Sequence, residues 1–201
     1  MNNNLIQYIF GIADNCLILG QRLGELCGHG PSLETDIALT NISLDLLGQT
    51  RSYYQYVAQL QGGDATEDTV AFLRVENQYL NTLLVEQPNT DFGYSIARQF
   101  LFDVFHLLLL EELQNSKDEN LSAIAKKSIK EVLYHKRFSS DWIKRLGDGT
   151  DESHSRIQTA INDLWIFTDE LFHQTDPDKA MVSQGIGVDV TLLKTKYYKE
   201  V

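Results

Sequence analysis

Proline is rare in this chain and stands only where the hydrophobic pattern breaks. Among 201 residues there are three prolines, Pro31, Pro88 and Pro177. Because proline ends or kinks a helix, this spacing leaves room for long uninterrupted helices. Alternation of apolar and polar residues, which would indicate strands, does not persist over any useful length. The sequence therefore predicts an all-α fold built from long helices.

Glycine and capping residues divide the chain into predicted helices. The segment Gly28–Pro31 ends the first helix, and Ser32 is the predicted N-cap of the second. Gly62-Gly63 stops the second helix, and Asp64 and Glu67 have capping-box spacing at the start of the third. Short loops between long helices imply an antiparallel bundle. Within a single domain, 1–201, helices are predicted at 5–27, 33–60, 64–86, 91–114, 117–146 and 151–173, followed by extra C-terminal helices after Pro177 and near 190–199.

Charge and cysteine usage restrict the classes of partner and the compartment. The formal net charge is −11, which argues against nucleic acid and anionic membrane as partners, since both bind clustered Lys and Arg. The most apolar stretch, 100–110, is too short to span a bilayer. Cys16 and Cys27 lie roughly 16 Å apart along one predicted helix, too far for a disulfide with each other. With no signal peptide visible, we expect a cytoplasmic protein with reduced thiols.

Several polar residues occupy predicted helix faces that are otherwise apolar. Burying a polar group is costly unless it is paired, so these side chains are expected to meet partners on the same or facing helices. Helical bundles can also hold a di-metal centre, which takes Glu-x-x-His pairs from two helices and a Glu from each of two others. The residues concerned are Asp45, Gln49, Asp103, His106, Glu131 and His135.

Two interpretations of this cluster follow, and the residue types favour the second. The first is a working metal site built from Asp45, Asp103, His106, Glu131 and His135. The second is a buried network of ion pairs and hydrogen bonds that lacks a metal. No two strict Glu-x-x-His motifs lie on core-facing helices.

The residues at individual positions favour the same interpretation. Val132 stands where a Glu would complete the motif with His135. The strict match Glu170–His173 lies at a predicted helix end and is a weak signal. A stand-alone di-metal oxidase would further need Asp45 and Glu25 to complete its ligand shell.

An ordered set of short segments, none specific alone, resembles one known family. Together they closely resemble the family of C-type, non-catalytic subunits of the bacterial phenylacetyl-CoA epoxidases, also called phenylacetate-CoA oxygenases. The segments are Asp14–Leu17, Gln21–Glu25, Leu44–Gln49, Leu84–Asn89, Tyr134–Ser139, Arg145–Asp151 and Leu164–Thr168.

The resemblance implies a ferritin-like bundle and a role in aerobic phenylacetate catabolism. In such systems a sister A-type subunit holds the di-iron centre, binds phenylacetyl-CoA and inserts one oxygen atom into the ring as a 1,2-epoxide. A reductase component supplies electrons through NADPH, flavin and an iron–sulfur centre. The C-type subunit is implied to be a non-catalytic paralogue without cofactor. In agreement, Leu46, Gln49 and Val132 replace the hard ligands that iron requires.

The implied partners are therefore protein subunits. We expect an apolar helix face to bury upwards of roughly 2,000 Å² against the catalytic A-type subunit, and other subunits of the complex to bind as well. The chain alone is expected to be capable of forming a homodimer through the same face. The alternatives are a stand-alone di-metal oxidase and a helical binding module unrelated to oxygenases.

Overall fold

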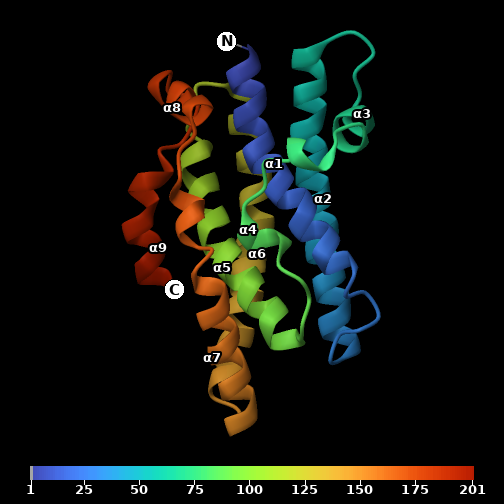
Figure 1. Ribbon diagram of the computed structural model, residues 1–201, viewed down its shortest axis with the longest axis vertical. Coiled ribbons are helices and arrows are strands. Elements are labelled where there is room, and N and C mark those ends of the chain that lie inside the picture. Colours follow the sequence, from blue (N-terminus) through green and yellow to red (C-terminus); the bar gives the residue numbers. More distant parts are fainter. Residues whose placement is uncertain (1) are drawn as a thin grey trace.

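Two helical hairpins form the body of the molecule. The computed structural model describes residues 2–201, and the side chains from residue 3 onward. The first hairpin consists of α1 (Asn2–Gly24) and α2 (Leu33–Gln61), and the second of α5 (Phe92–Leu113) and α6 (Glu119–Gly147). Helix α1 packs against α2, α5 against α6, and α2 against α6. Figure 1 shows these helices side by side in an all-α, ferritin-like bundle.

Capping residues set the ends of the long helices close to the predicted positions. The side chain of Ser32 accepts a hydrogen bond from the Thr35 amide at the start of α2. Asp91 and Asp118 cap α5 and α6 in the same way. Gly62 and Gly63 follow α2 with φ angles of 72° and 63°, a backbone conformation that side chains with a Cβ rarely adopt. These boundaries of the long helices are confirmed, whereas α1 ends at Gly24 and not at the predicted Cys27.

The predicted third helix, 64–86, is wrong. The crossover between the hairpins instead contains three short pieces, α3 (Glu67–Phe72), the 3₁₀ turn η1 (Glu76–Gln78) and α4 (Leu83–Glu86). The N-cap of α3 is Thr66, which forms a capping box with Thr69, and not the predicted Asp64. Figure 1 shows this crossover returning along the bundle, so that α2 and α5 run in the same direction.

Side chains of α1 hold the crossover in its irregular path. The Leu80 amide donates to Oδ2 of Asp14 at 2.7 Å, and the Thr82 amide donates to Oδ1 of Asn15 at 2.8 Å. Arg74 donates to both oxygens of Asp14 at 2.8 Å, and its guanidinium lies 4.1 Å from the centre of the Phe10 ring. These bonds replace the i to i−4 bonds that a continuous helix would have made.

The C-terminal segment covers one side of the bundle. It contains α7 (Asp151–Trp165), the 3₁₀ turn η2 (Asp169–Phe172), α8 (Asp176–Ser183), the 3₁₀ turn η3 (Val190–Leu193) and α9 (Lys194–Glu200). Helix α7 packs on α5 and α6, α8 on α1, and α9 on α5. The amide of Val188 donates to the hydroxyl of Tyr8 at 3.0 Å, so the last part of the chain is joined to the first helix.

The predicted helix 151–173 is wrong beyond Trp165. The buried Thr168 donates its hydroxyl to the Trp165 carbonyl, and the chain turns there. The turn lets Leu171 and Phe172 enter the core, where the Phe172 ring contacts the ring of Tyr197 edge-on at 5.2 Å. Burying two large apolar side chains stabilises the fold by several kcal/mol. This gain outweighs the stability that further turns of a solvent-exposed helix would have added.

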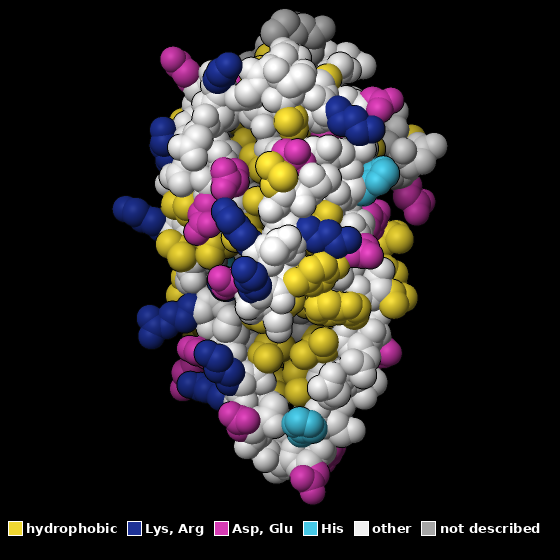
Figure 2. Space-filling model, turned by 90° about the vertical axis from the view of Figure 1, so that its left-hand side faces the viewer, with side chains coloured by type: hydrophobic (Ala, Val, Ile, Leu, Met, Phe, Trp, Pro, Cys, Tyr) yellow, Lys and Arg dark blue, Asp and Glu magenta, His cyan; other side chains and the backbone are white. Residues whose placement is uncertain are grey.

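The outer surface of the C-terminal segment mixes charged and apolar groups. Hydrophobic side chains gather near the middle of this face, with Lys, Arg, Asp and Glu distributed around them (Figure 2). Exposed apolar side chains of this part of the chain include Trp165, Ile166, Leu192 and Tyr198. Over the described residues, no helix combines the length and apolar character needed to span a bilayer.

Candidate functional site

Asp103 is the most deeply buried carboxylate of the polar cluster. It lies in α5 with none of its surface exposed. Its two oxygens accept hydrogen bonds from Gln99 Nε2 at 2.6 Å and from Ser139 Oγ of α6 at 2.8 Å. Burial raises the pKa of Asp103 to about 7, although the nearby His135 and these two hydrogen bonds act in the opposite direction. The carboxyl group therefore changes its protonation state near neutral pH.

His106 lies one turn further along α5 and faces α1. Its Nε2 is 3.8 Å from the sulfur of Cys16, which in turn lies 4.0 Å from Oε1 of Gln49 in α2. Burial, together with a smaller effect of the nearby His135, lowers the pKa of His106 to about 3. Burial also raises the pKa of the Cys16 thiol to about 12. Both groups are therefore uncharged at neutral pH.

Two further pairs join α2 to α6. Gln49 Nε2 donates to Oε2 of Glu131 at 3.0 Å. His135, which is fully buried, places its Nε2 3.1 Å from Oδ2 of Asp45, whose side chain is 36% exposed. The cluster therefore extends from the buried middle of α5 to the surface between α2 and α6.

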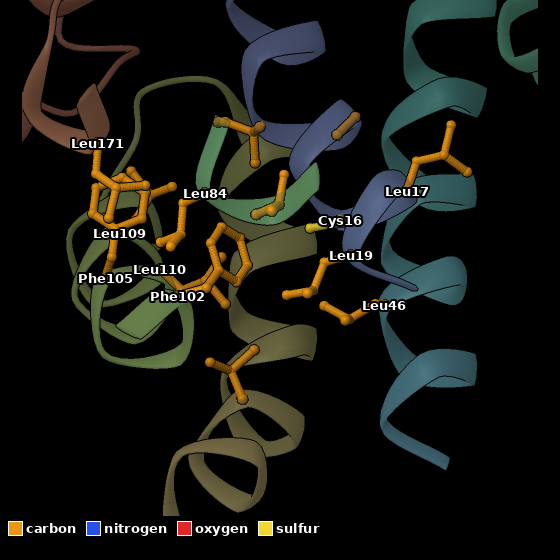
Figure 3. Close-up of a cluster of buried hydrophobic side chains, with 14 of the residues drawn as sticks. Cys16, Leu17, Leu19, Leu46, Leu84, Phe102, Phe105, Leu109, Leu110 and Leu171 are labelled. Carbon is orange, nitrogen blue, oxygen red and sulfur yellow. The ribbon is translucent and has the colours of Figure 1, made fainter. Parts of the chain in front are cut away.

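The donors of this cluster do not fit a di-metal carboxylate centre. Each carboxylate is already bonded to an N–H or O–H group of the same chain, and the three carboxylates have different partners. Leu46 and Val132 are fully buried at the interior positions that would have to carry ligands. Figure 3 shows Leu46 with Leu19 in the apolar packing between the helices. Within residues 2–201, no three His, Cys, Asp or Glu side chains are grouped to hold a metal ion.

The structure brings the sequence-predicted residues into one region but pairs them differently from a ligand set. Asp103 and His106 bond to facing helices and not to each other. Glu25, which a di-metal site would need, instead pairs with Arg22 at 3.1 Å near the end of α1. Glu170, from the one strict motif, accepts a hydrogen bond from the Leu83 amide.

Three members of the cluster are not evident from the sequence alone. Cys16, Gln99 and Ser139 are small or neutral polar residues that resemble ordinary core or surface positions. A signal is nevertheless available for Ser139, since it follows His135 by four residues and therefore lies on the same helix face. Gln99 likewise precedes Asp103 by four. Both cysteines are free, as predicted from their spacing.

An apolar stripe on the outer face of α2 is a second feature of interest. It consists of Leu33, Ile37 and Leu44, whose residues are 72%, 50% and 61% exposed. Spacings of four and seven residues place all three on one face. Gly48 continues this face, and a Cβ added there would meet no described atom within 4 Å. Large apolar side chains gathered on one helix face typically mark a surface for association.

Comparison with known proteins agrees with this architecture. The family model described as phenylacetic acid catabolic protein matches residues 1–201. The chain is 51% identical over 199 residues to the C-type subunit of 1,2-phenylacetyl-CoA epoxidase of Escherichia coli (strain K12), an alignment that covers 99% of this chain and 80% of that protein. The chain therefore belongs to the phenylacetic acid catabolic protein family.

Proposed function

We propose that this chain is a structural component of a phenylacetyl-CoA 1,2-epoxidase, and that it packs against the catalytic di-iron subunit, which it stabilises. One observation carries the proposal. The carboxylates of Asp45, Asp103 and Glu131 bond to donors of this chain and do not converge. Such a chain has the fold of a ferritin-like oxygenase subunit without the set of metal ligands that a di-iron centre needs. The similarity to the C-type subunit of the E. coli epoxidase supports the same assignment.

In this assignment the redox chemistry belongs to other components. The di-iron centre resides in the catalytic subunit, and NADPH, flavin and an iron–sulfur centre belong to a reductase. The present chain contributes binding energy. A partner that binds only the folded form of the catalytic subunit stabilises it by mass action.

The apolar stripe of α2 is the surface that we assign to the catalytic subunit. Its apolar side chains interact poorly with water. Burying them against another helix face is therefore favourable, with a free energy of about 25 cal/mol per Å² of buried apolar area. Gly48 lets the backbone of a partner helix come close to α2. Tyr134, which is 48% exposed on the neighbouring helix α6, lies near Glu34 and Ala38 of α2.

The test is to measure binding of purified catalytic subunit to charge variants of this chain. Leu44→Glu places a charge in the centre of the stripe and is expected to weaken binding at least tenfold. Leu192→Glu is the matched control, because Leu192 is 72% exposed and lies in η3, away from α2. The thermal stability of the catalytic subunit should rise when wild-type chain is added and should not rise with Leu44→Glu.

Equal weakening by both variants would contradict the assignment of the interface. Failure of the wild-type chain to bind or stabilise the catalytic subunit would contradict the proposed function itself. Without its partner, the chain is expected to associate with a second copy through the same stripe. Sedimentation of the isolated chain should therefore show a dimer that Leu44→Glu dissociates and Leu192→Glu does not.

A further inference from the structure

A cavity of about 350 Å³ lies between the bundle and the C-terminal segment. Its walls come from α1, α5, the crossover and the segment that follows α7. Aromatic and aliphatic side chains dominate the lining, among them Phe102, Phe105, Leu109 and Leu171. Figure 3 shows Phe105, Leu109 and Leu171 close together between α5 and the C-terminal segment, and Phe102 on the side of α5 toward α1. This volume is at the lower end of the range of small-ligand pockets, which suits a single ring and not a CoA thioester.

His106 supplies a polar group to the lining of this cavity. The residue is 1% exposed to solvent, and its Nδ1 finds no hydrogen-bond partner among the described residues. Buried polar atoms are nearly always paired, and leaving one unpaired costs free energy. The other ring nitrogen faces Cys16. An unpaired nitrogen beside an apolar cavity is therefore placed to bond a ligand.

The charges near the cavity select against anions. Burial keeps the imidazole of His106 neutral, with a pKa lowered to about 3, so it offers no positive charge to a carboxylate. Glu170, Asp178 and His173 also line the cavity, and the two carboxylates outnumber the single imidazole of His173 and repel an anion. A hydroxyl group suits the site because it either donates to Nδ1 or accepts from it, whichever tautomer the Cys16 contact selects.

We propose that this cavity binds a small neutral aromatic molecule that carries a hydroxyl group, with its ring among the apolar side chains and its hydroxyl bonded to Nδ1 of His106. This site lies apart from the α2 stripe and does not depend on the catalytic partner. Its ligand would be recognised by the folded chain alone.

The test compares phenol with benzene as ligands of the full-length chain, by titration calorimetry or by chemical-shift perturbation. Phenol is expected to bind at least fivefold more tightly than benzene, because only phenol satisfies Nδ1. In His106→Phe the ring volume is kept and the nitrogen is lost, so this advantage should vanish while benzene binding stays within about twofold. Phenylacetate, as the anionic probe, is expected to bind more weakly than phenol.

A second variant keeps the proposal testable if His106→Phe does not fold. Leu109→Phe narrows the cavity and leaves His106 intact, so it should weaken phenol and benzene together. Leu108→Phe is its matched control, because Leu108 is equally well buried in the same helix but does not line the cavity. Equal affinities of the wild type for phenol and benzene, tighter binding of phenylacetate, or absence of binding at millimolar concentration would each overturn the proposal.

Discussion

Asp103→Asn is the substitution that most directly tests the electrostatics of the bundle interior. Asparagine has nearly the same shape as aspartate but cannot ionise. Its amide would face Gln99 or Ser139, which both donate to Asp103. Gln99 adapts by rotating its amide, because its Oε1 has no partner within the described part of the chain. The variant therefore removes a titrating group with little loss of packing.

The magnitude follows from the difference in pKa between the folded and unfolded states. The pKa of Asp103 rises from 3.8 to about 7 on folding. Below pH 4 the carboxyl is protonated in both states and carries no penalty. As the pH rises from 4 to 7, the unfolded chain releases the proton and the folded chain retains it. The wild type therefore loses about 1.4 kcal/mol of unfolding free energy per pH unit, or about 4 kcal/mol in total.

His106 has the opposite effect over an overlapping range. Its pKa falls from 6.5 to about 3 on folding. As the pH falls from 6.5 to 3, the unfolded chain gains a proton that the folded chain does not, and stability decreases. The contributions of Asp103 and His106 therefore cancel between pH 4 and 6.5 in the wild type. In Asp103→Asn the pH dependence that comes from His106 is no longer cancelled by Asp103, so the unfolding free energy should rise with pH.

Urea unfolding at pH values from about 4 to about 8 measures this difference. Relative to wild type, Asp103→Asn should gain about 4 kcal/mol between the two ends of the range. Asp64→Asn is the control, because Asp64 is exposed and solvated in both states, so its difference from wild type should stay constant. If the difference between Asp103→Asn and wild type is also independent of pH, the ionisation argument is refuted.

Two substitutions test the anchoring of the crossover and the start of α7. Arg74→Met leaves Asp14 buried without its ion pair and should lower the unfolding free energy by about 3–5 kcal/mol, measured by urea unfolding. The control Arg51→Met removes an arginine whose side chain is 69% exposed and should cost less than about 1 kcal/mol, so equal losses would contradict the argument. Thr150→Ala removes a capping box and should cost about 1 kcal/mol by the same assay. Thr159→Ala, at an exposed mid-helix position, removes no cap and should raise stability by up to about 0.7 kcal/mol through helix propensity, and a neutral Thr150→Ala would show that the cap contributes nothing.

The fold was predictable from the sequence where helix signals are local. Ser32, Gly62 and the rarity of proline define long helices without reference to the rest of the chain. The crossover was not predictable in this way, because its conformation depends on Asp14 and Asn15, which lie 66 and 67 residues before the amides that they bind. The end of α7 depends in the same way on a tertiary gain, the burial of Leu171 and Phe172.

Six members of the candidate site were predictable from the sequence, whereas Cys16, Gln99, Ser139 and the pairing of all the members were not. Polar residues such as Asp103 and His106 stand out because burial of an unpaired polar group is costly. Which partner each one takes depends on the rotation of α5 relative to α1 and α6, and no spacing in the sequence encodes that rotation. The cavity is harder still to foresee, because its walls come from segments far apart in the chain.

The bond between Tyr8 and Val188 has a consequence for synthesis of the chain. A ribosome adds on the order of 5–20 residues per second, so the first helix waits on the order of ten seconds for the segment that covers it. During that interval the face of α1 that α8 later covers is available to chaperones and to neighbouring nascent chains. Closure of the molecule is therefore a late event, completed only when the segment around Val188 has left the ribosome.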